Sequence, residues 1–180
     1  MTTQPMTTQP ITIATLTAAE AEAALDQLAD ILVNAVAHGA SVNFLAGFTA
    51  EEARRFWRGQ LPGIAAGERI LIVAADGAQL VGTVIVSFAP QPNAPHRAEI
   101  GKMLVHSAYR RRGLGARLLA AAEAAARDAG RSLLMLDTQS GSDGERLYRR
   151  CGWTKVGEIP DHSLTPNGRL APTSLYYKKV

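Results

Sequence analysis

The chain has 180 residues, of which 47% are hydrophobic and 19% are charged, and its formal net charge is +3 at pH 7. This length and composition suit one domain with one sizeable core and exclude a chain that is disordered throughout. The small net charge does not require a nucleic-acid partner, and no apolar run is long enough to span a bilayer. The single cysteine, Cys151, and the absence of a secretory signal lead us to expect a cytoplasmic protein.

The first ten residues repeat the pentad Met-Thr-Thr-Gln-Pro. This segment is polar and low in complexity, and it holds too little apolar surface to drive folding, so residues 1–10 are predicted to be disordered. Residues 11–180 contain no linker and are predicted to form one domain. The second methionine, Met6, offers an alternative start of translation.

The predicted elements of the N-terminal half are short apolar strands and helices that begin at capping boxes. In chain order they are a strand over 11–16, a helix over 18–37, a loop over 38–48, a short helix over 49–57, and strands over 70–74 and 80–88. Thr17 with Glu20 caps the first helix, and Thr49 with Glu52 caps the second. Asp76-Gly77 joins the last two strands and is typical of a hairpin turn.

The C-terminal half alternates strands with helices. In chain order it contains a strand over 98–106, a helix over 113–129, a strand over 132–138, a helix over 142–151, and strands over 153–159 and 174–179. Antiparallel runs followed by β-α-β crossovers predict an α/β fold. We therefore expect a single domain with a mixed, mostly antiparallel central sheet and helices on both faces.

A glycine-rich motif, Arg110-x-x-Gly113-x-Gly115, lies between a predicted strand and a predicted helix. Glycines let backbone N–H groups approach a ligand closely, and the helix aims its unpaired N–H groups and positive dipole end at the same place. The neighbouring arginines can bind phosphate bidentately. Together these features predict an anion site suited to a pyrophosphate.

Two other phosphate-binding motifs do not fit this segment. A dinucleotide fingerprint requires a third glycine where Leu118 stands. A Walker A loop requires Gly-Lys-Ser/Thr where residues 115–117 read Gly-Ala-Arg. The structural alternative is an ordinary glycine turn with solvated arginines.

The region from Glu99 to Trp153 resembles the GNAT superfamily of N-acetyltransferases in two motifs at the superfamily's usual separation. Its acetyl-coenzyme A signature is matched by Met103-Leu104-Val105 and by Arg110 to Gly115. Its Leu-Tyr-x-x-x-Gly-aromatic segment is matched by Leu147 to Trp153. The superfamily's fold has the same order of elements, so the resemblance implies a GNAT-type N-acetyltransferase domain over residues 11–180.

A closer resemblance, to the tabtoxin-resistance acetyltransferases of bacteria, extends over nearly the whole chain. It is carried by segments outside the two motifs, namely 38–44, 97–99, 136–138, 141–142, 156–160, 165–170 and 172–173. Those enzymes acetylate the amine of a β-lactam-containing amino acid toxin, which suggests toxin resistance. One departure from the superfamily is Gly141, where many members carry Asn.

The resemblance implies acetyl-coenzyme A as cosubstrate and assigns residues to three roles. The cofactor-binding residues are Met103, Leu104, Val105, Arg110, Arg111, Arg112, Gly113, Leu114, Gly115 and Ala116. Tyr148 matches the tyrosine that donates a proton to the coenzyme A sulfur. Glu99 and Asp137 match carboxylates that are assigned as the general base, acting through water. His38 and Ser41 lie in the segment that resembles the substrate side.

Structural roles stay open for the proposed catalytic residues. Tyr148 can be an aromatic packed in the core. Glu99 can pair with a neighbouring basic residue, Arg97 or Lys102, and Asp137 can cap a loop. At the period of two, Glu99 is expected to share its strand face with Met103 and Val105.

The resulting hypothesis is that a small primary amine, such as an amino acid-like toxin or metabolite, attacks acetyl-coenzyme A directly in a ternary complex. Cys151 lies four residues after Leu147 on one helix face, which favours core packing over a role as nucleophile. His96, His106 and His162 lack metal-ligand spacing, so no metal is expected. A monomer and a homodimer both stay open, as do an acyl-coenzyme A sensor without turnover and a protein or peptide N-acetyltransferase.

Overall fold

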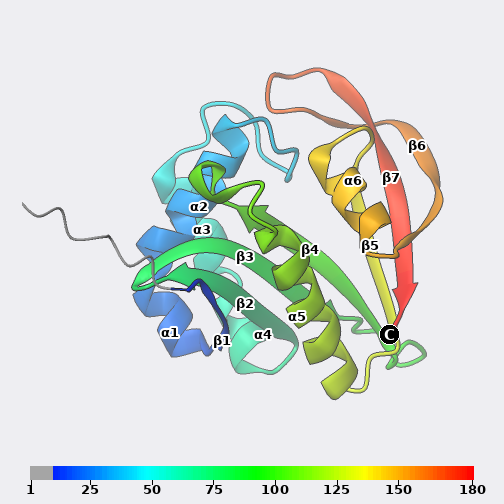
Figure 1. Ribbon diagram of the computed structural model, residues 1–180, viewed down its shortest axis with the longest axis horizontal. Helices are drawn as coiled ribbons and strands as arrows, with labels where there is room; N and C mark the ends of the chain where they lie inside the picture. The colour runs from blue at the N-terminus through cyan, green and yellow to red at the C-terminus, as the bar shows by residue number, and fades with distance from the viewer. Residues whose placement is uncertain (1–9) are drawn as a thin grey trace, which may run out of the picture.

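The computed structural model describes residues 10–180 (Figure 1). The disorder predicted for residues 1–10 therefore lies outside the described residues except at Pro10, which is exposed and belongs to no element. The described chain forms a seven-stranded sheet in the order β1-β2-β3-β4-β5-β7-β6. Only β4 and β5 run parallel, and every other pair of neighbours is antiparallel. The predicted α/β fold with a mixed, mostly antiparallel sheet is confirmed.

The strands and helices follow the predicted order, with additions. They are β1 (Thr12–Leu16), α1 (Ala18–Ala23), α2 (Leu25–Ala37), α3 (Ala50–Arg58), α4 (Leu61–Ala65), β2 (Arg69–Asp76), β3 (Gln79–Phe88), β4 (Arg97–Val105), the 3-10 turn η1 (Ser107–Tyr109), α5 (Leu114–Asp128), β5 (Leu133–Gln139), α6 (Asp143–Arg150), β6 (Thr154–Leu164) and β7 (Leu170–Lys179). Both N-terminal capping boxes form, at Thr17 and at Thr49. The β2–β3 hairpin turns between Asp76 and Gln79, as predicted.

Several boundaries differ from the predictions, and β7, for example, begins at Leu170 rather than at residue 174. The helix predicted over 18–37 is broken at Ala24, whose φ of −98° and ψ of 11° are not helical. Alanine favours helix, so packing sets this break rather than local propensity. The short helix α4 was not predicted, because Pro62 and Gly63 obscure its periodicity, although proline is tolerated in a first helical turn. β6 extends past Pro160, which an edge strand tolerates.

Helices cover both faces of the sheet, as expected. On one face α5 lies across the strands (Figure 1) and buries Leu118, Leu119 and Ala122 completely, in a core that also holds Tyr148 of α6. On the other face α1, α2 and α3 form a second core. There the fully buried Trp57 donates its indole N–H to the carbonyl oxygen of Leu28 at 2.9 Å, which ties α3 to α2. None of the helices within residues 10–180 is long and apolar enough to cross a membrane.

The sheet opens between its two parallel strands. β4 pairs with β5 only over Arg97–Glu99, which face Leu133–Met135. Beyond that point β4 continues to Val105, while β5 stays paired with β7 as far as Gln139. Glu99 is therefore the last residue of β4 before the two strands diverge.

A β-bulge reverses the side-chain alternation of β4 just after this divergence. Thr83 pairs with Leu104 and Ile85 pairs with Gly101, so Lys102 and Met103 together oppose a single residue of β3. Lys102 takes a φ of 45°, and the buried Thr83 hydroxyl donates to its carbonyl oxygen at 2.8 Å.

The bulge overturns the expectation that Glu99 shares a strand face with Met103 and Val105. Ala98 and Ile100 belong to the core under α5, so Glu99 between them faces the opposite side. Met103 and Val105 pack against the core under α5. One extra residue in the strand thus puts the Glu99 carboxylate and the side chains of Met103 and Val105 on opposite faces.

Candidate functional site

Two carboxylates flank the opening in the sheet from the side covered by α1–α4. Asp137 is exposed on β5 next to the buried Leu136, which belongs to the core under α5, so Asp137 faces away from that core, as Glu99 does. Neither carboxylate makes an ion pair or a hydrogen bond with another side chain or backbone group of residues 10–180. The ion pairs and the loop cap that were the structural alternatives for these two residues do not form in the described chain.

Lys102 lies between these carboxylates and an aromatic wall, and sequence reasoning considered it only as a partner for Glu99. Its ammonium sits 5.1 Å from the ring centre of Phe56 and 6.0 Å from that of Phe44. Burial lowers the pKa of this ammonium, while the charges of Asp137 and Glu99 oppose that shift. Lys102 is therefore within electrostatic reach of both carboxylates. The available signal in the sequence was a lysine followed directly by the apolar end of the strand, Met103-Leu104-Val105.

Tyr148 approaches the opening from the opposite face. Its side chain is 7% exposed and packs near Trp153 and Tyr176, with ring centres 6.0 and 6.3 Å away. Its hydroxyl makes no hydrogen bond to any group of residues 10–180. Burial raises the pKa of Tyr148 strongly, and the Asp137 carboxylate raises it further. The phenol is therefore protonated at neutral pH and has a free proton to donate.

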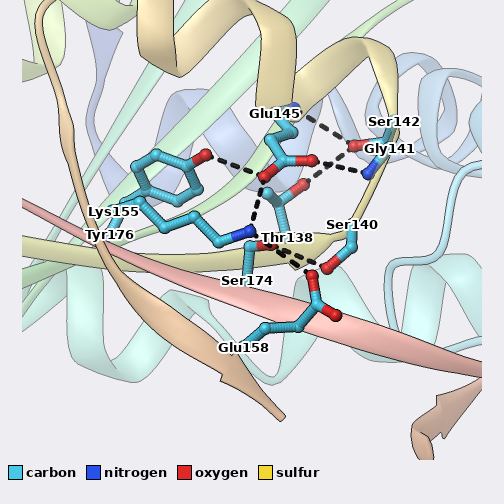
Figure 2. Close-up of polar contacts among 9 residues, drawn as sticks. All are labelled: Thr138, Ser140, Gly141, Ser142, Glu145, Lys155, Glu158, Ser174 and Tyr176. Atoms are coloured by element: carbon cyan, nitrogen blue, oxygen red, sulfur yellow. Dashed lines mark hydrogen bonds and ion pairs between the residues drawn. The ribbon is translucent and has the colours of Figure 1, made fainter. Parts of the chain in front are cut away.

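A polar network fixes α6, and with it Tyr148, against β7 (Figure 2). Glu145 lies one helical turn before Tyr148 and is 8% exposed. Its carboxylate accepts hydrogen bonds from the Gly141 N–H at 2.6 Å, the Tyr176 hydroxyl at 2.8 Å and the Lys155 ammonium at 3.2 Å. The first of these contacts contributes most to lowering the pKa of Glu145 to about 2, and burial opposes the shift.

The predicted anion site has the geometry of an uncapped helix start. Gly113 precedes α5 with a φ of 73°, where glycine is strongly favoured, and no side chain caps the helix. No acidic residue lies in the first turn of α5. The first N–H groups of the helix belong to Leu114, Gly115 and Ala116 and have no partner within the helix. They therefore point outward, in the same direction as the positive end of the helix dipole.

The three consecutive arginines next to this helix start differ in what holds them. Arg110 donates its Nε–H to the Val105 carbonyl oxygen at 3.2 Å, which ties the loop to the end of β4. Arg112 packs over the Tyr109 ring at 5.1 Å. Arg111 is exposed and takes a φ of 61°. The arginines thus surround the helix start with positive charge, and Arg111 and Arg112 remain exposed.

Gly115 has a packing role as well as the predicted ligand role. A β-carbon at this position would meet a methyl group of Leu147 at 3.0 Å and Met103 at 3.6 Å. The absence of a side chain lets α5, α6 and β4 approach one another closely. The close approach at Gly115 brings together the glycine-rich motif, the end of β4 and the helix of Tyr148.

A cavity of about 610 Å³ lies at the end of β5, and neither carboxylate is in its wall. It is lined by residues of α2 and of the loop after it, by the end of β5, and by the turn between β6 and β7: Val33, Val36, Ala37, Gly39, Ala46, Gly47, Phe48, Gln139, Thr165, Pro166, Asn167, Arg169, Leu170, Ala171 and Pro172. Sequence reasoning did not identify Gln139 or Arg169. His38 and Ser41 do not line the cavity, but Gly39 between them does.

His38 has a structural contact at the end of α2. It is exposed, and its ring Nδ1 lies 2.8 Å from the Asn34 carbonyl oxygen. Ser41 is half-buried. Both residues are beside the cavity rather than in its wall. Within residues 10–180, His, Cys, Asp and Glu side chains form no group that could hold a metal ion.

The acetyltransferase (GNAT) family model matches residues 33–153, which include the carboxylates, the anion site and Tyr148. The fold is similar to that of an N-acetyltransferase from Staphylococcus aureus Mu50, with a TM-score of 0.78 and 14% identity over 95% of this chain and 99% of that chain. It is also similar to a Salmonella typhimurium protein described as an acetyltransferase and solved with acetyl-coenzyme A, with a TM-score of 0.77 and 17% identity over 95% and 94% of the two chains. A ribosomal-protein-alanine N-acetyltransferase from Brucella melitensis matches with a TM-score of 0.73 and 23% identity over 94% and 99%.

The Glu145 network gives a pH-dependent prediction for stability. Because the folded protein lowers the pKa of this carboxyl from 4.5 to about 2, its contribution is full above about pH 4.5 and is lost as the pH falls towards 2. Glu145→Gln should reduce the free energy of unfolding by about 2 kcal/mol at pH 7, as for a lost hydrogen-bonded charge. Urea unfolding from pH 7 to pH 2 should show the difference between wild type and variant shrinking below pH 4.5.

The matched control is Glu158→Gln, which removes the other carboxylate that Lys155 contacts. Glu158 is on the exposed edge strand, so its replacement should change stability little at any pH. A difference between wild type and Glu145→Gln that stays constant down to pH 2 would contradict the assignment of the stabilisation to the ionised carboxylate.

Proposed function

The chain belongs to the acetyltransferase (GNAT) family, whose members use acetyl-coenzyme A, and on that premise we propose that it acetylates a primary amine of a small molecule. The observation that carries this proposal is the opening between β4 and β5. Two unpaired carboxylates, Glu99 and Asp137, stand on one side of it, and the unpartnered hydroxyl of Tyr148 approaches from the other. An amine acetyltransferase needs such a pair of functions, a base for the amine and an acid for the departing thiolate.

Acetyl-coenzyme A fits the residues at the start of α5. The uncapped N–H groups of Leu114, Gly115 and Ala116 and the exposed guanidinium groups of Arg111 and Arg112 would hold its pyrophosphate. The backbone of Met103, Leu104 and Val105 does not pair with β5. It would bind the pantetheine arm and the acetyl carbonyl. Arg110 is assigned to the same site, where it also fixes the loop.

The carboxylates are assigned to the amine. An alkylammonium has a pKa of about 10 and must lose a proton before its nitrogen can attack. Glu99 and Asp137 would accept that proton, directly or through water, and their negative charge would attract the ammonium form into the opening. Tyr148 would then protonate the coenzyme A sulfur, since its hydroxyl donates to no group of residues 10–180 and its proton is available.

Direct transfer is proposed because Cys151, the single cysteine of the sequence, is poorly suited to carry the acetyl group. Burial raises the pKa of the Cys151 thiol, and its backbone carbonyl oxygen accepts a hydrogen bond from Lys178 at 2.9 Å. A thiol with a raised pKa is a poor nucleophile at neutral pH. The Cys151 side chain is partly buried against the core under α5, which indicates a packing role.

A small acceptor suits the cavity beside the carboxylates. The Ala46 N–H donates to the Pro166 carbonyl oxygen at 2.7 Å, so the loop after α2 touches the β6–β7 turn across the cavity. A volume of about 610 Å³ is that of a small-molecule site. Together with the resemblance to tabtoxin-resistance enzymes, this favours an amino acid-like toxin or metabolite over a peptide. His38 and Ser41 are assigned to the rim, and the cytoplasm is the proposed location, with a single free cysteine in keeping with it.

The direct test is the release of coenzyme A from acetyl-coenzyme A by the purified protein with a panel of small amines and short peptides. Release that depends on a small amine, with an acetylated product of the expected mass, supports the proposal. Acetylation of peptides alone would assign the chain to peptide acetylation. Tight binding of acetyl-coenzyme A without release by any acceptor would assign it to acyl-coenzyme A sensing.

The first prediction of this function concerns the start of α5. Ala116→Asp puts a carboxylate in the first helical turn, where it would repel a pyrophosphate although it favours the helix itself. We expect the dissociation constant of acetyl-coenzyme A to rise at least about tenfold, as for the loss of one favourable charged contact, while the melting temperature is kept. Calorimetry measures the affinity, and the neutral variant Ala116→Asn is the control for size. Equal affinities of the two variants would remove the anion site from this helix start.

The second prediction concerns Tyr148. If its hydroxyl protonates the departing thiolate, Tyr148→Phe should lower kcat by about 10²–10⁴-fold, the usual contribution of general acid catalysis. The affinity for acetyl-coenzyme A should change little, because only the hydroxyl is removed. Steady-state kinetics together with calorimetry separates the two effects. An increase in KM with kcat unchanged would mean that Tyr148 serves binding or packing alone.

The third prediction concerns the carboxylates. Glu99→Gln and Asp137→Asn keep side-chain size but remove the base, so each should lower the plateau of kcat/KM and flatten its rise with pH. If the two residues act as a unit, the double variant should lose much less than the product of the single losses. Both residues are exposed and unpaired, so the melting temperature should stay unchanged. Unaltered pH profiles in both variants would exclude these groups as the base.

A further inference from the structure

Lys102 is the one charged group at the opening that the proposed chemistry does not use. Its ammonium packs over the rings of Phe56 and Phe44, and it makes no hydrogen bond or ion pair with any group of residues 10–180. An ammonium has three N–H donors and no acceptor. Its polar donors are therefore available to a ligand on the side away from the rings.

A cation at this position opposes the binding of a simple amine. The charge of Lys102 interacts with both Asp137 and Glu99, so an incoming ammonium that reaches these carboxylates is close to a like charge. Like charges at such separations repel, most strongly where burial reduces solvent screening. The repulsion is cancelled if the acceptor carries a negative group next to its amine.

The cavity leads to Lys102 along an aromatic wall. Phe48 lines the cavity, and its ring stacks on that of Phe44 with centres 4.0 Å apart. Phe44 in turn contacts the Lys102 ammonium. On the opposite wall, Gln139 lines the cavity and shares a strand face with Asp137 at the period of two. The two walls of the cavity therefore continue towards the cation through Phe44 and towards Asp137 along β5, although neither charged group lines the cavity itself.

We propose that Lys102 is a specificity-determining residue that binds a carboxylate of the acceptor, so that the acceptor is a zwitterion with its amine towards Glu99 and Asp137. This inference rests on the proposed acetylation of a small amine and deepens it. The β-bulge is what makes the arrangement possible, because the extra residue turns Lys102 out of the core under α5 and against Phe44 and Phe56.

The test compares L-amino acids with their carboxamides and with the corresponding decarboxylated amines, with kcat/KM measured for each. Wild-type protein should prefer the carboxylate-bearing member by about tenfold to a hundredfold, the usual effect of a hydrogen-bonded charge. Lys102→Met keeps an unbranched, slightly shorter side chain without the charge and should abolish the preference through an increase in KM for the amino acids. Its activity with the decarboxylated amines should be kept or raised, because the repelling cation is gone.

Three further variants control the interpretation. Lys102→Arg should retain most of the preference, since it keeps the charge. Lys179→Met removes an exposed lysine at the end of β7, next to the start of β5 and away from the opening, and should leave the preference intact. Arg169→Met removes the guanidinium that lines the cavity. If Arg169→Met abolishes the preference and Lys102→Met does not, the assignment to Lys102 is overturned.

Lys102→Asn replaces Lys102→Met if the latter does not fold, because Asn tolerates a positive φ.

The remaining outcomes separate this inference from the function on which it rests. Equal turnover of amino acids and decarboxylated amines by wild-type protein would overturn the inference and leave amine acetylation standing. If no amine is acetylated, the proposed function fails, and calorimetric titration of the same amino acids and carboxamides in the presence of coenzyme A still decides. Binding that prefers the carboxylate and depends on Lys102 would support the inference, and equal binding would overturn it.

Discussion

The pairing between β4 and β5 ends at Glu99. The rest of the site depends on the separation of the two strands beyond this residue. Up to this point β4 is an ordinary strand between two cores. Beyond it, β5 remains held by β7, while the segment from Met103 to Val105 keeps its pairing with β3 but has no partner on the side of β5. Unpaired backbone N–H and C=O groups in a protein interior need partners. A strand that diverges from its neighbour therefore offers a row of backbone groups to a ligand, and the chain on either side supplies the charged groups.

Each flank of the opening is fixed by a different kind of interaction. On the side of α5 the contact is steric, since the missing β-carbon of Gly115 lets Leu147 and Met103 approach the helix start. Tyr148 depends in addition on the buried carboxylate of Glu145, which fastens α6 to Tyr176 (Figure 2). A buried carboxylate is stable only when its hydrogen bonds are satisfied, so this network also defines one position for α6. On the other side the fixing element is the bulge at Lys102, whose carbonyl oxygen is held by Thr83.

The charges around the opening are mixed, and this mixture bears on selectivity. Glu99 and Asp137 alone would favour any cationic amine. The ammonium of Lys102 partly offsets their charge and has itself a lowered pKa because of burial. Such an arrangement discriminates by repulsion as well as by attraction, because a group that lacks the complementary charge leaves the cation uncompensated. The aromatic rings beneath Lys102 supply a cation–π contact that makes the partly buried charge tolerable.

Local sequence by itself determined the family motifs, the β2–β3 hairpin, the capping boxes and the order of strands and helices, because these depend on residues within a few positions of one another. It also placed Gly113 directly before α5, since a turn of that kind favours a positive φ. Only the tertiary structure decided which way Glu99 points. A period of two predicts a shared face with Met103, but the bulge that reverses it arises from pairing with β3. The role of Lys102, the β6–β7 wall of the cavity and the break at Ala24 were likewise set by packing between distant segments, which no local pattern encodes.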